Sequence, residues 1–151
     1  MYQRILVPVD GSPTSNAGLA EAIKLAKLTG AQLRLLHVVD ELPFALGAEG
    51  GNAVAAEVLA LGRKAGERIL QDARTQVRDA GVAVDTVLSD AIGGRVSEFV
   101  AEQARLWDAD LIVVGTHGRR GVGRWVLGSD AELILRMAPV AVLMVRAGGA
   151  T

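Results

Sequence analysis

A glycine-rich segment near the C-terminus has the residue pattern that most resembles a chemical site. Residues 115–129 read GTHGRRGVGRWVLGS, after the apolar, strand-like run Leu111–Val114 and before a helical pattern that begins at Ser129. Glycines let a backbone approach a ligand closely, and the first free N–H groups of a helix attract anions. This strand, loop and helix order predicts a phosphate-binding loop.

Two common nucleotide motifs do not fit the chain. No Gly-x4-Gly-Lys-Ser/Thr sequence occurs, so the lysine of a P-loop is missing. A dinucleotide fingerprint fails as well, because the first strand is followed by the single glycine Gly11, and Gly121-x-Gly123 lacks a third glycine at the required place. A phosphate site here would need a different pattern.

A purely structural interpretation of the segment's far end stays open. Ser129-Asp-Ala-Glu132 reads as a capping box, in which the helix satisfies its own free amides, and Asp130 complements the helix dipole. Asp130 would then either repel a phosphate or help to hold a metal ion.

Asp10 and Ser12 follow the first strand, where one of them should cap the helix that starts at Pro13. Ser12 suits that role. Asp10, at the end of a central strand, needs a reason to be buried, and we expect it to face a ligand. His37 lies in an apolar strand, and we expect a hydrogen-bonded core or rim histidine rather than a catalyst.

Apolar runs and helix-period segments alternate along the chain. The predicted strands are Ile5–Val9, Leu33–Val39, Val82–Leu88, Leu111–Val114 and Val140–Val145, and the predicted helices are Pro13–Thr29, Asn52–Ala80, Arg95–Leu106 and Ser129–Met137. Strands that are apolar on both faces and alternate with helices predict an α/β fold, a five-stranded doubly wound parallel sheet with helices on both faces. Residues 42–52 are expected to form a loop.

Ligands of such sheets lie beyond the carboxyl ends of the strands, where the strand order reverses. Three segments should meet there, namely 8–12, 37–40 and the glycine-rich segment. The fold is therefore expected to bring distant residues to one edge of the sheet.

Composition limits the function classes. The 151 residues are 50% hydrophobic, carry a formal net charge of -1, and include no cysteine and two histidines. This excludes disulfides and iron–sulfur clusters, and argues against a nucleic-acid or membrane-surface binder. With no signal peptide and no long apolar run, we expect one soluble, cytoplasmic domain over residues 1–151.

The spacing Gly115-x2-Gly118-x9-Gly128-Ser129 resembles the universal stress protein family, in its ATP-binding branch. The stretches ILVPVDGSP, LLHVV, ADLIVVG and APVAVLMVR extend this resemblance over the whole chain. It implies an adenine nucleotide alpha-hydrolase-like fold with strand order 3-2-1-4-5.

The resemblance also implies roles for single residues. Asp10 and the backbone of Val38 would hold adenine, Pro8 would shape that wall, and Gly115 would lie against the ribose. ATP, with Mg²⁺ or Mn²⁺, would be the cofactor. The residues assigned to the phosphate end are Thr116, His117, Gly118, Arg119, Arg120, Gly121, Gly128, Ser129 and Asp130.

Three functions follow from this resemblance. The first is a cytosolic ATP-binding regulator of a stress response. The second is a slow ATPase or phosphotransfer enzyme that uses the same pocket, although no lysine or evident catalytic base supports fast turnover. The third is an interaction protein that binds no nucleotide.

Other features of the glycine-rich segment point to partners. Arg119, Arg120 and Arg124 make it locally basic, either as solvated charge or as phosphate contacts, with only a loose similarity to RNA-binding segments. Trp125 would either anchor the loop or contact a partner chain. Val140–Val145 would form an open apolar edge strand, which favours a homodimer through this strand.

Overall fold

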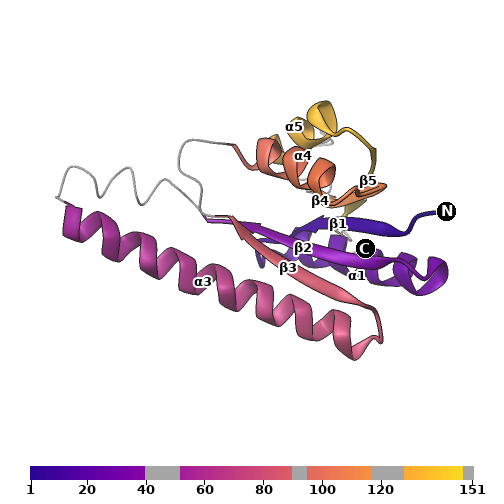
Figure 1. Cartoon of the computed structure of the whole chain (residues 1–151), viewed down its shortest axis with the longest axis horizontal. Helices are drawn as coiled ribbons and strands as arrows, with labels where there is room; N and C mark the ends of the chain where they lie inside the picture. The colour runs from indigo at the N-terminus through magenta and orange to yellow at the C-terminus, as the bar shows by residue number, and fades with distance from the viewer. Residues whose placement is uncertain (40–51, 90–94, 117–127, 148–151) are drawn as a thin grey trace, which may run out of the picture.

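The computed structural model describes residues 1–39, 52–89, 95–116 and 128–147. The strands are β1 (Arg4–Pro8), β2 (Gln32–Val38), β3 (Val84–Ser89), β4 (Leu111–Thr116) and β5 (Ala141–Arg146), and the helices are α1 (Pro13–Thr29), α3 (Asn52–Asp79), α4 (Val96–Leu106) and α5 (Ser129–Met137). All strand pairings are parallel, and the sheet order is β3-β2-β1-β4-β5 (Figure 1). The predicted doubly wound α/β sheet and its strand order are confirmed.

Two hydrophobic cores lie on the two faces of the sheet. One joins Leu33 and Leu35 of β2 to α1 and α3, and the other joins Leu36 of β2 to α4 and α5. In the central strand, Ile5, Leu6 and Val7 are all fully buried. Successive side chains of a strand point to opposite faces, so a strand covered on both sides is apolar at every position.

The end of β4 differs from the prediction. The strand extends past Val114, because Gly115 and Thr116 pair with Val145 and Arg146 of β5. The first glycine of the glycine-rich segment therefore belongs to the sheet and not to the loop.

Caps fix the ends of α1, as the sequence suggested. Ser12 is the N-cap, and its hydroxyl accepts a hydrogen bond from the backbone N–H of Ser15 at 3.2 Å. Pro13 occupies the first turn, where its missing N–H costs nothing. Gly30 ends the helix in the left-handed conformation, with φ 77°.

An ion pair between β2 and β3 lies over an aromatic ring at the end of α4, on the α4 side of the sheet. Arg34 Nε and Nη2 donate to the carboxylate of Asp85 at 2.8 and 2.9 Å, and the guanidinium lies 4.6 Å from the ring centre of Trp107. The hydrogen bonds that Arg34 donates to Asp85 raise the pKa of Arg34 against the opposing effect of burial. This cluster stabilises the packing of β2, β3 and α4.

The two edge strands of the sheet are β3 and β5, and the edge position of β5 was expected. Leu143, in the middle of β5, is partly exposed. Within the described ranges, no helix combines the length and the apolar character that crossing a membrane requires.

Candidate functional site

A pocket of about 220 Å³ lies at the carboxyl edge of the sheet, between the ends of β1, β2 and β4 and the first turns of α1 and α5. The pairing of β1 with β4 runs from Ile5–Leu111 to Leu6–Ile112, and the pocket lies beyond it. This is the point where the strand order reverses, as predicted for a ligand site. Its lining residues are Pro8, Val9, Asp10, Thr14, Ser15, Leu36, His37, Val38, Val96, Val114, Gly115, Gly128, Ser129, Asp130, Ala131 and Ile134.

The fold brings many of the predicted site residues together. Those that line the pocket are Pro8, Asp10, Val38, Gly115, Gly128, Ser129 and Asp130. Thr116 is buried next to the pocket and does not line it. His117, Gly118, Arg119, Arg120 and Gly121 lie outside the described residues, as do Arg124, Trp125 and the predicted loop up to residue 51. Their assigned roles stay predictions.

A short hydrogen-bond network holds Asp10 at the pocket. Its backbone N–H donates to Ser15 Oγ at 3.0 Å, and its Oδ1 accepts from the N–H of Ser12 at 2.8 Å. The N–H of Ser15 donates in turn to Ser12 Oγ. The side chain of Asp10 is exposed, so the expectation of a buried carboxylate was wrong. An exposed carboxylate carries no cost of burial on folding, and the fixed turn leaves it able to accept hydrogen bonds from a ligand.

His37 has a structural explanation, as the sequence suggested. Its Nδ1 donates to the carbonyl of Val9 at 2.8 Å, which places the proton on that nitrogen. The ring also lies against α3, where a Cβ added to Gly66 would come within 2.7 Å of His37 Cδ2. His37 therefore connects the end of β1, β2 and α3 at the wall of the pocket.

The start of α5 differs from the predicted capping box. Gly128 is the N-cap, with no side-chain cap hydrogen bond, and Ser129 is already the first helical residue. The backbone N–H of Glu132 donates a hydrogen bond to the Gly128 carbonyl. The carboxylate of Glu132 accepts a hydrogen bond from Arg136 Nη2 at 3.0 Å. No N-cap side chain accepts a hydrogen bond from the first amides of α5, and this end of the helix adjoins the pocket through Gly128, Ser129 and Asp130.

Gly115 is required by packing alone. A Cβ at this position would overlap the backbone carbonyl of Thr14 and would lie 3.1 Å from the N atom of Ser15. A Cβ at Gly18, one turn along α1, would come within 2.8 Å of the Gly115 N atom. The two glycines let the first turn of α1 approach the end of β4, and this close approach forms one wall of the pocket.

The sequence reasoning missed the apolar part of the lining. Leu36, Val96, Val114 and Ile134 come from four different elements. Each lies in an apolar stripe that predicts core, and each does belong to or pack against the core on this face of the sheet while also lining the pocket. An apolar wall with a few polar groups at its rim is typical of small-molecule sites.

The described part of the chain contains no group of three or more His, Cys, Asp or Glu side chains placed to hold a metal ion. Asp130 and Ser129 carry the oxygen donors of the pocket that lie nearest the start of α5. One carboxylate together with ligand phosphates is the usual protein contribution to a Mg²⁺ site. The donor set is compatible with a metal ion held largely by a bound phosphate.

Residues 1–146 match the family model described as "Universal stress protein family". The chain belongs to the universal stress protein family. A universal stress protein of Methanocaldococcus jannaschii is 34% identical over 147 residues, covering 97% of this chain and 83% of that one. A universal stress protein A homolog of Coxiella burnetii is 32% identical over 151 residues, covering 98% of this chain and 97% of that one.

Solved structures of the family share the fold of this universal stress protein. The protein from Burkholderia pseudomallei superposes with a TM-score of 0.74 at 32% identity, covering 95% of this chain and 96% of that one. Three more distant neighbours contain nucleotides. They are a universal stress protein with cAMP (23% identity, TM-score 0.67, 97% and 98% covered), one from Arabidopsis thaliana with AMP (13%, 0.70, 97% and 93%), and one from Archaeoglobus fulgidus with dAMP (22%, 0.68, 95% and 98%). At these identities the likeness establishes the fold alone.

Proposed function

We propose that this universal stress protein binds an adenine nucleotide, ATP in particular, in the pocket between β1, β4 and α5, and that it regulates a stress response through the bound state. The observation that carries the proposal is the start of α5, where amides without a side-chain cap adjoin a pocket with an apolar wall and Asp10 at its rim. Helix amides attract phosphate, and a fixed carboxylate can accept hydrogen bonds from a base. The neighbours that contain cAMP, AMP and dAMP support the same ligand class.

The size of the pocket suggests how a nucleotide would be divided over it. Its volume of about 220 Å³ is below the ~300–1,000 Å³ of common small-molecule pockets. The base and sugar would occupy the apolar part, next to Val38 and Gly115. The phosphates would extend over Ser129 and Asp130, which are exposed.

A divalent cation would accompany a triphosphate in this arrangement. Asp130 is the carboxylate placed to hold Mg²⁺ or Mn²⁺, and Ser129 could add a hydroxyl oxygen. The cation would neutralise phosphate charge beside Asp130. Without it, the carboxylate would repel the same phosphates.

Calorimetric titration tests the proposal. Protein at tens of micromolar concentration is titrated with ATP, AMP, cAMP and GTP, with Mg²⁺ and with EDTA, after bound nucleotide is extracted and identified from natively purified material. We expect one adenine nucleotide per chain and a preference for ATP in Mg²⁺. Asp10→Ala should abolish the adenine preference, whereas Asp72→Ala, an exposed carboxylate on α3, should leave it unchanged. Absence of heat with every adenine nucleotide would refute the proposal.

The same preparation distinguishes the alternative functions. Retention of intact ATP through purification supports a regulator, whereas phosphate release well above ~1 per second supports an enzyme. An interaction protein without nucleotide would tolerate a bulky residue at Gly118, a change that should abolish binding in the other two.

We also propose a homodimer through β5, in the cytoplasm. β5 is an edge strand of six residues whose Leu143 is partly exposed, and an open apolar edge favours pairing with a second copy. Leu143→Lys should then yield monomers in sedimentation at micromolar concentration. A monomeric wild-type protein under the same conditions would contradict this assembly.

A further inference from the structure

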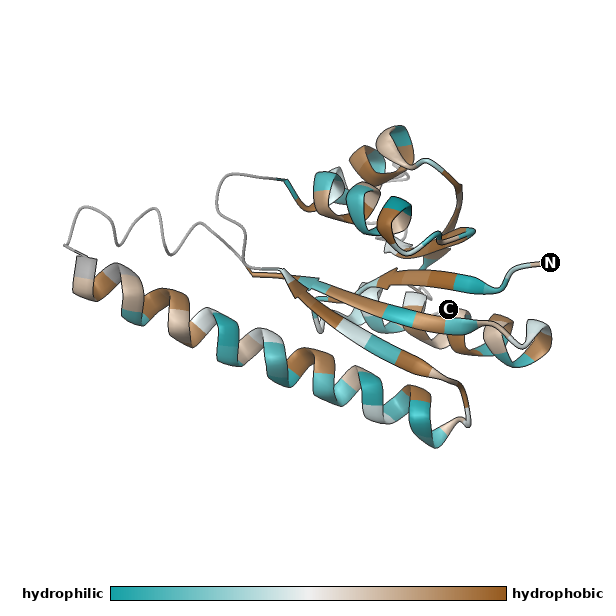
Figure 2. Cartoon of the chain, viewed as in Figure 1, coloured by the Kyte–Doolittle hydropathy of each residue, from teal (hydrophilic) through white to brown (hydrophobic). Residues whose placement is uncertain are grey.

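The first part of α3 is apolar at nearly every position. Residues 53–62 read AVAAEVLALG and contain one charged side chain, Glu57. This part of the helix extends past the ends of β2 and β3 (Figure 1), and Figure 2 shows almost no hydrophilic colour on it. A surface helix of a soluble protein normally carries polar residues on its solvent side, so a segment whose solvent side is largely apolar is expected to be covered.

A continuous apolar stripe runs along this segment and is exposed except at Val58, which is half-buried. Val54, Val58, Leu61 and Ala65 follow one another at intervals of four, three and four residues, which places them on one side of the helix. Leu61 is 62% exposed and Val54 is 47% exposed. The side that faces the sheet is a different one, because Gly62 lies against Val39 there. At about 100° per residue, Leu61 lies a quarter-turn or more away from that contact.

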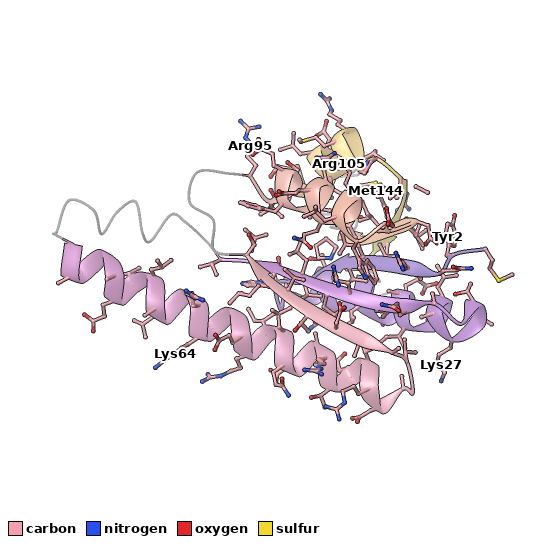
Figure 3. All side chains as sticks on the ribbon, in the orientation of Figure 1. Tyr2, Lys27, Lys64, Arg95, Arg105 and Met144 are labelled. Carbon is pink, nitrogen blue, oxygen red and sulfur yellow. The ribbon has the colours of Figure 1, made fainter. Side chains whose placement is uncertain are left out.

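Two opposite charges border the stripe along the same flank. Glu57 and Lys64 are seven residues apart, nearly two helical turns, and both are exposed. Figure 3 shows the Lys64 side chain pointing away from the sheet. Neither residue forms an ion pair with another described residue.

The apolar stripe and its two bordering charges match a second copy of themselves only when the two helices run antiparallel. If two copies of α3 lie antiparallel about a two-fold axis at Leu61, a residue four positions before Leu61 lies beside one three or four positions after it in the other copy. Glu57 of each copy then lies beside Lys64 of the other. A parallel pair would instead place Glu57 beside Glu57, which is repulsive.

We infer that the stripe from Val54 to Ala65 binds a second copy of this chain through an antiparallel contact between the two α3 helices. Leu61 packs against Leu61 at the two-fold axis, and the Glu57–Lys64 pairs fix the direction. α3 packs on β2 and β3, near the sheet edge opposite to β5. The contact is therefore separate from the proposed β5 dimer and would join such dimers into tetramers.

Sedimentation velocity over about 10 µM to 1 mM tests the contact, since a surface of this size gives a weak association. The measurement uses the wild type and Leu143→Lys, in which β5 pairing is disabled. In both backgrounds the mean mass should rise with concentration, and Leu61→Glu should abolish that rise. Leu28→Glu is the matched control, because Leu28 is an exposed leucine on α1, with 82% of its surface accessible. It should change nothing.

Charge reversal tests the direction of the pair. Glu57→Lys and Lys64→Glu should each weaken association at least about threefold, and the double variant should restore it. A Leu143→Lys protein that stays monomeric over the whole range would overturn the inference, as would undiminished association of Leu61→Glu. Association that the double variant fails to restore would also overturn it, because it would exclude the antiparallel arrangement.

Discussion

Gly115→Ala should damage both the stability and the pocket, whether or not a ligand is present. The added Cβ would overlap the Thr14 carbonyl oxygen and lie 2.5 Å from its carbon. Carbon atoms in contact are best separated by ~3.5 Å, so the first turn of α1 or the end of β4 must move by about 1 Å. Both neighbours are backbone, and no side-chain rotation can relieve the overlap.

The expected cost follows from this geometry. Overpacking commonly costs ~1–3 kcal/mol, and the rigid neighbours favour the upper end of that range. For a domain of this size, each kcal/mol lowers Tm by about 2–4 °C, so Tm should fall by about 6–12 °C. ATP affinity should fall with it, because the wall made by Thr14 and Ser15 moves.

Thermal unfolding followed by circular dichroism, with calorimetric titration of ATP, measures both effects. The matched control is Gly62→Ala, in which the added Cβ meets a single side-chain methyl, Val39 Cγ1, at 3.1 Å. That variant should stay within about 1 kcal/mol of the wild type, because helix propensity offsets the tighter contact. A Gly115→Ala protein with unchanged Tm would refute the packing argument, and lost affinity at unchanged Tm would favour a direct ribose contact.

Three further changes probe the same site. Ser15→Ala removes the acceptor of the Asp10 N–H and should weaken ATP binding about 3–10-fold. The same change made in an Asp10→Ala protein should leave the ATP affinity nearly unchanged. Additive losses in the double variant would show that Ser15 does not act through Asp10. Gly66→Ala should lower stability by about 1 kcal/mol in chemical denaturation, since contact with the His37 ring outweighs the gain in helix propensity, and equal or higher stability would contradict that contact. Asp130→Asn should strengthen ATP binding in EDTA and reduce the gain on adding Mg²⁺; an equal change under both conditions would remove Asp130 from the proposed metal site.

The fold was predictable because its signals are local. Apolar runs such as Ile5–Val9 and the helical periods between them lie within short windows of sequence, and parallel strands joined by helices leave few topologies. Ser12 as the cap of α1 and His37 as a bonded rim residue were also predictable, since both depend on neighbours along the chain or on the same edge of the sheet.

Two local signals failed where the tertiary structure competes with them. Ser129 and Glu132 have the spacing of a capping box with Ser129 as the N-cap, but Gly128 takes the N-cap position and α5 begins one residue earlier, at Ser129. Gly115 looked like the first residue of a loop, but it pairs with Val145 in the sheet. At Gly115 the pairing with distant β5 decides the boundary, and no window of sequence contains that contact.

The sequence by itself determined the family, the order of elements and the residues that can meet at the carboxyl edge of the sheet. Only the tertiary structure decided that Asp10 is exposed, that the Gly115–Gly18 pair lets α1 approach β4, and that the core residues Leu36, Val96 and Ile134 also line a cavity. The physical reason is the same throughout. Hydrophobic periodicity in the sequence specifies which face of each helix or strand is buried. The position of the pocket depends instead on where β1 and β4 stop pairing, beyond Leu6 and Ile112, and only the folded sheet shows that point.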